Sequence, residues 1–197
     1  MSKARDFEAQ LHRVEAQLHL IQKVARQLVR AGALSESLQS IVTMVGDVMH
    51  ADSCLLYLLG EDELVLVAAK DARTKAIGNV SLRLSEGLTG WVARERRLLA
   101  ISREAFNDPR FKFFRDLPED TFEAFLSVPV IVRNKVVGVI NLQHRQPHSH
   151  TGDEMEMLTT VGELIGSLVL TSRVEAALDP VNYAELALRT IPAAQTS

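Results

Sequence analysis

The stretch AFLSVPVIVRNKVVGVINLQH, from Ala124 to His144, predicts two long apolar strands folded back on each other. Its arms, Phe125 to Val132 and Val136 to Leu142, are nearly unbroken in Val, Ile and Leu, a composition typical of strands covered on both faces. The polar residues Arg133 to Lys135 supply the turn, in which Asn134 readily takes the left-handed conformation that a tight hairpin needs. We therefore expect a β-hairpin at the centre of the fold.

The rest of the chain arranges itself around this hairpin. The expected elements are helices over about residues 7–28 and 34–50, strands over 53–59, 64–69 and 80–84, a short helix after residue 86, a strand over 98–102, the hairpin, and a helix from about 151 or 153 to 177. Tight links between neighbouring strands favour an antiparallel sheet, and the longer helices gather at the two chain ends. The fold class predicted is α+β.

The first helix carries a regular apolar seam. Steps of four and three alternate along Phe7, Leu11, Val14, Leu18, Ile21, Ala25 and Leu28. This heptad spacing is typical of a coiled coil or helical bundle, and it predicts a homodimer formed through the terminal helices. The alternative is an amphipathic helix that packs on its own globule.

Composition narrows the class of protein. The chain has 197 residues, 47% of them apolar, which is enough for one sizeable core. Its net charge is −3, with no stripe of basic residues, so a direct nucleic acid partner is not expected. No run approaches the roughly 18 apolar residues that a membrane span needs, and the single cysteine, Cys54, fits a reducing compartment. We expect a cytoplasmic protein that does not contact membranes.

The segment from Glu104 to Glu123 is unusually aromatic. It holds five of the seven phenylalanines together with three positive side chains, and Asp108 followed by Pro109 indicates a helix start. Long connections of this kind are usually functional or disordered, and this one is too aromatic to be disordered.

Four local features, in this order and spacing, resemble a GAF domain, a small-molecule sensor module of signalling proteins. They are the strand from Ser53 to Leu59, the turn into helix from Glu86 to Ala93, the segment from Asn107 to Phe111, and the hairpin segments Ser127 to Val130 and Gly138 to Leu142. The resemblance covers about Leu34 to Leu170. The chain is most similar to GAF domains of nitrogen-related phosphoenolpyruvate-protein phosphotransferases and of NifA-type activators.

The resemblance implies a six-stranded antiparallel sheet, with the N- and C-terminal helices packed on one face and a ligand pocket on the other. It also implies dimerisation through a helical bundle. The 197 residues themselves contain neither a phosphotransferase body nor an ATPase. A downstream signalling protein would then be a separate chain, unless the sequence is an excised sensor domain. The domain organisation predicted is a helix over 1–33, the GAF domain over 34–177, and a flexible tail over 178–197.

The predicted pocket combines aromatic side chains with a few polar groups. Its candidate ligand-binding residues are Trp91, Phe106, Arg110, Phe111, Phe114, Phe122, Ser127, Asn141 and Gln143. The arginines, including Arg115 nearby, would hold an anion, and Asn141 and Gln143 would hydrogen-bond it. Alternatively, the aromatic residues fill the space between loop and sheet. The sequence names neither the ligand nor a cofactor.

Catalysis is not expected. GAF-like methionine sulfoxide reductases need several cysteines, because a second thiol must resolve the oxidised first one, and the Cys-His dipeptide of bilin-binding pockets is missing. Cys54 fits a buried core residue, and an enzyme built on it is the least favoured alternative. The histidines His144, His148 and His150 could chelate zinc with Asp153 or Glu154, but surface loops collect such residues without a metal, and we expect none here.

The function predicted is a non-catalytic signalling domain that binds a small molecule over the sheet and passes the event to a dimeric helical bundle. The alternative is an interaction module without a ligand, whose pocket is filled by its own phenylalanines.

Overall fold

The computed structural model describes residues 2–30, 32–70, 76–111 and 122–177. Its helices are α1 (Ser2–Leu28), α2 (Leu34–Val48), α3 (Gly87–Glu95) and α4 (Gly152–Ala177), with a short 3-10 turn η2 (Ala105–Asn107). Its strands are β1 (Ser53–Leu59), β2 (Glu63–Lys70), β3 (Ser81–Arg83), β4 (Leu99–Ile101), β5 (Ala124–Val132) and β6 (Lys135–His144). The predicted tail beyond residue 177 lies outside the described residues.

The strands form one six-stranded antiparallel sheet in the order β3-β2-β1-β6-β5-β4. The central hairpin is confirmed: Val132 pairs with Lys135, and the two turn residues Arg133 and Asn134 have φ of 46° and 62°. Two left-handed residues give a turn whose twist matches that of the strands. Arg96 donates hydrogen bonds to both oxygens of Asn134, each at 2.6 Å, and so ties the turn to the end of α3.

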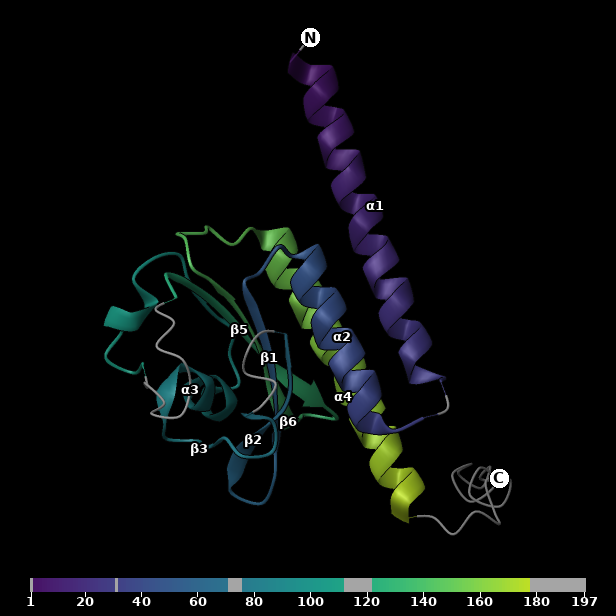
Figure 1. Cartoon of the computed structure of the whole chain (residues 1–197), viewed down its shortest axis with the longest axis vertical. Helices are drawn as coiled ribbons and strands as arrows, with labels where there is room; N and C mark the ends of the chain where they lie inside the picture. The colour runs from purple at the N-terminus through teal and green to yellow at the C-terminus, as the bar shows by residue number, and fades with distance from the viewer. Residues whose placement is uncertain (1, 31, 71–75, 112–121, 178–197) are drawn as a thin grey trace, which may run out of the picture.

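The sheet separates two layers of helices, as the resemblance implied (Figure 1). On the helix face, α2 lies over β1 and β2, α4 lies over β5 and β6, and α1 packs on α2 and α4. On the α3 face, the short helix α3 lies over β5 and β6. We use these two names, helix face and α3 face, throughout.

Alternation along the strands assigns side chains to the two faces. In β1, Cys54 and Leu56 belong to the large core under α2 and α4, whereas Leu55 and Tyr57 belong to a smaller core under α3. The helix-face core is completed by β5 and β6 residues and by Leu158, Val161 and Ile165 of α4.

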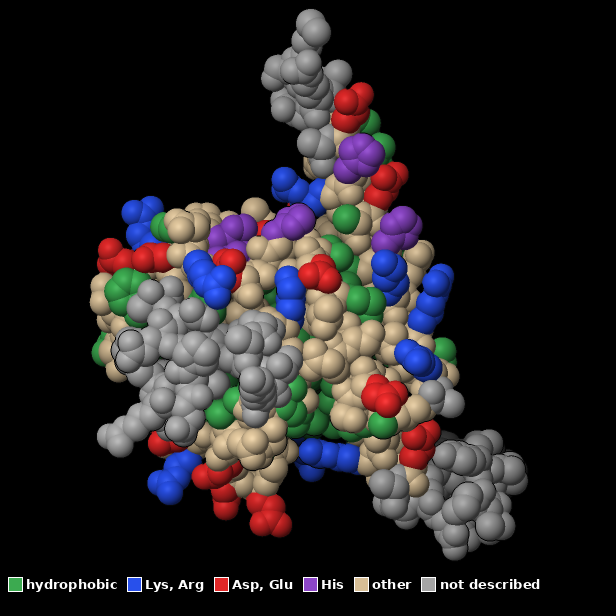
Figure 2. Space-filling view, viewed as in Figure 1, with side chains coloured by type: hydrophobic (Ala, Val, Ile, Leu, Met, Phe, Trp, Pro, Cys, Tyr) green, Lys and Arg blue, Asp and Glu red, His purple; other side chains and the backbone are tan. Residues whose placement is uncertain are grey.

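Helix α1 packs on the globule mainly through a stripe beside the predicted seam, and the seam residues Ile21 and Leu28 are only partly buried there. Leu20 and Val24 are buried against the globule, while Phe7, Leu11, Val14 and Leu18 of the seam are 48% to 68% exposed. At 100° per residue the two stripes lie roughly a third of a turn apart on the helix. The N-terminal half of α1 extends beyond the globule, and hydrophobic side chains show between its charged ones (Figures 1 and 2).

The predicted helix start at Asp108 and Pro109 is wrong within the described residues. Residues 108–111 form a β-turn in which the Phe111 N–H donates to the Asp108 carbonyl at 2.8 Å. The Asp108 carboxylate accepts the N–H of Arg110, two residues on, instead of capping a helix.

Candidate ligand-binding site

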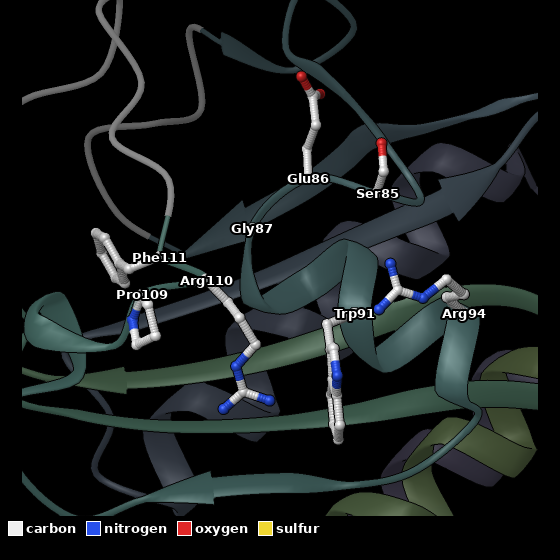
Figure 3. A pocket seen from close by; sticks show the side chains of 8 residues that line it. All are labelled: Ser85, Glu86, Gly87, Trp91, Arg94, Pro109, Arg110 and Phe111. Carbon is white, nitrogen blue, oxygen red and sulfur yellow. The ribbon is translucent and has the colours of Figure 1, made fainter.

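A hollow of about 540 Å³ opens on the α3 face, between α3 and the turn at residues 108–111. Two segments line it (Figure 3): Ser85, Glu86, Gly87, Trp91 and Arg94 on one side, and Pro109, Arg110 and Phe111 on the other. Gly87, Trp91 and Arg94 follow helical spacing, which places them on one side of α3. Two guanidinium groups, one carboxylate and two aromatic rings suit a small polar molecule better than a lipid.

Arg110 is held in a defined position at this hollow. Its Nε and terminal nitrogen donate to the two Asp108 carboxylate oxygens at 2.8 and 2.7 Å, and its guanidinium carbon lies 4.6 Å from the centre of the Trp91 ring. Figure 3 shows the side chains of Arg110 and Trp91 lying side by side. Stacking of this kind contributes about 0.5–1 kcal/mol at partly exposed sites. Asp108 therefore fixes a cation against an aromatic face before any ligand arrives.

The contact between Asp108 and Arg110 keeps both side chains in their charged forms. The hydrogen bonds from Arg110 hold the pKa of Asp108 below its usual value, and the same contact raises the pKa of Arg110. Asp108 engages two of the five side-chain N–H donors of Arg110, which leaves others to meet an acceptor in the hollow.

The predicted polar contacts Ser127 and Asn141 form a buried chain of hydrogen bonds. The Ser127 hydroxyl donates to Asn141 Oδ1 at 2.6 Å, and Asn141 Nδ2 donates to the Thr89 hydroxyl at 2.8 Å. All three residues are at most 8% exposed. This chain joins β5 and β6 to α3, so Ser127 and Asn141 position the helix beside the hollow rather than line it.

The structure places the nine predicted ligand-binding residues in different locations. The structure brings Trp91, Arg110 and Phe111 together at the hollow. Gln143 and Phe122 are buried, and Phe106 is half-buried in η2. Phe114 lies outside the described residues, as does Arg115. Ligand binding by the nine remains a prediction.

Sequence reasoning missed Ser85, Glu86, Gly87, Arg94 and Pro109 in the lining, and Thr89 in the buried chain. The signal for Gly87 and Arg94 was present, because both share a side of α3 with Trp91 at helical spacing.

Comparison with known proteins decides the family. Residues 33–169 match the family model of the GAF domain. The chain belongs to the GAF domain family. This GAF domain is 27% identical over 176 residues to the phosphoenolpyruvate-dependent phosphotransferase system of Salmonella typhimurium, covering 88% of the chain and 23% of that protein. It is also 27% identical to the Nif-specific regulatory protein of Azospirillum lipoferum, covering 86% of the chain and 28% of that protein.

A solved structure agrees. The crystal structure of the GAF domain from the Acinetobacter phosphoenolpyruvate-protein phosphotransferase superposes with a TM-score of 0.74 at 27% identity, covering 84% of this chain and 98% of that one. The resemblance inferred from the motifs is confirmed. The GAF domain spans about a quarter of the length of the curated relatives it matches.

Proposed function

We propose that this GAF domain is a non-catalytic sensor that binds a small anionic molecule in the hollow beside α3 and signals through its terminal helices. One observation carries the proposal: Asp108 holds the Arg110 guanidinium over Trp91 at the edge of a hollow with room for a small molecule. A carboxylate or phosphate would meet the remaining donors of Arg110, and a planar group would stack on the rings of Trp91 or Phe111.

The route from the hollow to the helices runs through the sheet. Asn141 contacts Thr89 of α3, and the next residue of β6, Leu142, belongs to the core beneath α2 and α4. A ligand that binds one position of α3 more tightly than another would bias β6 and so α4. The sensor proposal requires this coupling from α3 through β6 to α4.

The ligand test is a thermal-shift screen of the purified full chain against amino acids, 2-oxo acids, cyclic nucleotides and tetrapyrroles. We expect one class to raise the melting temperature by several degrees. Arg110→Gln should abolish that rise, and Arg103→Gln, an exposed arginine on the same connection that does not line the hollow, should keep it. Absence of a shift with every class would contradict ligand binding.

The proposed dimer forms through α1 of two copies. Four of the large hydrophobic side chains that are exposed in the described residues, Phe7, Leu11, Val14 and Leu18, lie on α1 at heptad spacing. The fitting occupant is a second copy of the same helix, because heptad knobs pack into holes made by a helix of equal spacing. The stripe that packs on the globule leaves these four side chains of the seam exposed.

Analytical ultracentrifugation tests the dimer. Leu11→Glu with Leu18→Glu should give a monomer with an unchanged melting curve of the globule, because both side chains are about half exposed. His12→Glu with His19→Glu adds two acids roughly a third of a turn away from the seam, on an exposed side of α1, and should remain dimeric. A seam variant that stays fully dimeric would refute the seam.

The runner-up function is an interaction module without a ligand. It is favoured by the hydrogen bonds that Ser127 and Asn141 already make inside the protein. A protein that is dimeric through α1 yet unresponsive in the screen would support it. A thiol enzyme is not supported, because Cys54 is fully buried in the helix-face core, whereas a reactive thiolate must be accessible.

We further propose a cytoplasmic location, a separate signalling protein as partner, and no direct contact with nucleic acid or membrane. The net charge of −3 supports the exclusion of nucleic acid. Residues Gly152–Glu175 of α4 are long and apolar enough to span a membrane. Leu158, Val161 and Ile165 of that helix are fully buried in the core, and core helices of soluble proteins pass the same test.

A further inference from the structure

Three histidine side chains converge at the junction of β6 and α4, away from the hollow. One candidate ligand atom from each of His144, His148 and His150 lies within 4.8 Å of the others. The rings of His144 and His148 stack with centroids 4.2 Å apart, and the His150 ring lies 4.8 Å from that of His148. Figure 2 shows histidine side chains in purple both on α1 and on the upper edge of the globule.

Each histidine is placed by a different part of the fold. His144 ends β6 opposite Ala124 and is 7% exposed. The loop that follows is anchored to the end of β4, because the His148 N–H donates to the Ser102 carbonyl at 3.0 Å. His150 comes just before Thr151, which caps α4 by accepting the Glu154 N–H at 3.2 Å. Strand pairing, a backbone hydrogen bond and a helix cap therefore hold the three histidines in place, so the cluster does not depend on a loosely held loop.

One ring nitrogen in the cluster is unsatisfied. Nε2 of His150 is buried and has no hydrogen-bond partner within the part of the chain that the structure describes. Leaving such an atom unpaired costs about 1–3 kcal/mol. A metal ion bound between the rings would supply the missing partner.

A carboxylate orients one of the three rings. Glu154 Oε1 lies 3.1 Å from His148 Nε2, and Glu154 Oε2 accepts the Thr151 N–H at 2.7 Å. When a carboxylate accepts from one ring nitrogen, the other nitrogen is left as the ligand, an arrangement common around protein-bound zinc. Glu154 is fixed for that role by its own capping bonds.

We propose that His144, His148 and His150 bind a divalent transition-metal ion such as Zn²⁺, with Glu154 orienting His148. Three imidazoles with no thiolate suit Zn²⁺, Ni²⁺ or Cu²⁺ and do not suit Mg²⁺ or Ca²⁺. Zn–N bonds are about 2.0–2.1 Å long. The candidate ligand nitrogens, which lie within 4.8 Å of one another, must therefore move closer together by roughly 1 Å. The stacked rings of His144 and His148 must also tilt.

Burial lowers the pKa of two of the three rings. Burial, together with the neighbouring His148 and His144, lowers the pKa of His150 to about 4, and burial and His148 lower the pKa of His144. An ion here would join the first turn of α4 to the ends of β6 and β4.

The test uses tag-free full-length protein stripped with EDTA and titrated with ZnCl₂ by calorimetry, with CoCl₂ absorption as a second readout of the ligand geometry. We expect one Zn²⁺ per chain, a raised melting temperature, and no response to MgCl₂ or CaCl₂. His148→Ala, whose side chain is 33% exposed in the native protein and so should not prevent folding, should weaken binding at least tenfold. His150→Asn should do the same.

Two further variants make the result specific. His12→Asn removes an exposed histidine on α1 and should bind Zn²⁺ like the native chain. Glu154→Gln should weaken binding about 10- to 100-fold while leaving the stoichiometry at one. Absence of stoichiometric Zn²⁺ binding, or equal affinity in the folded His148→Ala and native proteins, would overturn the site.

Discussion

The two faces of the sheet are covered differently, although strand side chains such as Leu66 and Val139 on the α3 face are also fully buried. On the helix face, strand side chains such as Leu126 and Ile140 are fully buried beneath α2 and α4. On the α3 face the covering helix has nine residues, a polar chain runs through the buried layer, and a hollow opens beside it. Because the α3 face has the smaller core and an open hollow, we expect it to rearrange at lower cost than the helix face.

The largest expected difference comes from truncating a leucine on each face. Leu126→Ala on the helix face should lower the free energy of unfolding by about 3–5 kcal/mol, because α2, α4 and the sheet cannot close the cavity. Leu55→Ala on the α3 face should lower it by about 2–3 kcal/mol, since α3 can settle into the space. Urea denaturation measures both, and an equal or larger loss in Leu55→Ala would show that the α3 face is packed as rigidly as the other.

Two glycines probe how closely each helix approaches its surroundings. A Cβ at Gly90 of α3 would lie 2.5 Å from the Arg83 carbonyl oxygen, so Gly90→Ala should displace α3 and lower the unfolding free energy by about 1–3 kcal/mol. A Cβ at Gly162 of α4 would come no closer than 3.7 Å to the Pro129 carbonyl oxygen. Gly162→Ala should therefore stabilise by about 0.5–1 kcal/mol through helix propensity alone.

Thermal and urea unfolding of the two variants give the check. Opposite signs are expected, and destabilisation by Gly162→Ala would mean that α4 is seated more tightly than its distances indicate.

The buried polar chain should matter more than a hydroxyl on the other face. Thr89→Val keeps the shape but leaves Asn141 Nδ2 without its acceptor, so it should cost about 1–3 kcal/mol. The matched control is Thr159→Val in α4, whose hydroxyl donates to the Met155 carbonyl of its own helix at 2.8 Å. We expect less than about 0.5 kcal/mol there, because that carbonyl keeps its helical bond. Equal losses would remove the special role of the chain.

The same contrast explains what the sequence could predict. The β-hairpin, the strand order along the chain and the antiparallel sheet follow from local patterns, because apolar runs and the Arg133-Asn134 turn dictate them residue by residue. The helix face is predictable for the same reason, since its core repeats helical and strand periods.

The hollow could be predicted only in part. Trp91, Arg110 and Phe111 were found by residue type, but type does not reveal that Ser127 and Asn141 bond each other across β5 and β6. Their pairing depends on strand register and on which side chain α3 brings to Asn141. Asp108 was assigned a helix cap because Asp-Pro favours one, whereas its side chain instead holds Arg110. The contacts of Ser127, Asn141 and Thr89 are tertiary and carry no local signal, whereas the contact of Asp108 with Arg110 is a local turn contact that the helix-start interpretation overlooked.

Apart from the control variants, a small effect on stability is expected from the Asp108 and Arg110 pair, whose side chains are 16% and 36% exposed. Because hydrogen bonds from Arg110 depress the pKa of Asp108 below its unfolded value, the pair stabilises the protein above that unfolded value, and the contribution is lost as pH falls through the folded pKa. Asp108→Asn should therefore lower the unfolding free energy by about 0.5–1 kcal/mol at pH 7.

The difference between Asp108→Asn and the native protein should be constant from about pH 7 to 5 and should shrink below about pH 4. Urea denaturation across this range measures it, and Asp62→Asn, an exposed acid in the link between β1 and β2, gives the baseline. A difference that persists undiminished at pH 2 would mean that Asp108 acts through the shape of the turn and not through its charge. In that case the backbone geometry of the turn, rather than the charge of Asp108, would hold Arg110 at the hollow. Arg110 would then stay over Trp91 even when Asp108 is neutral.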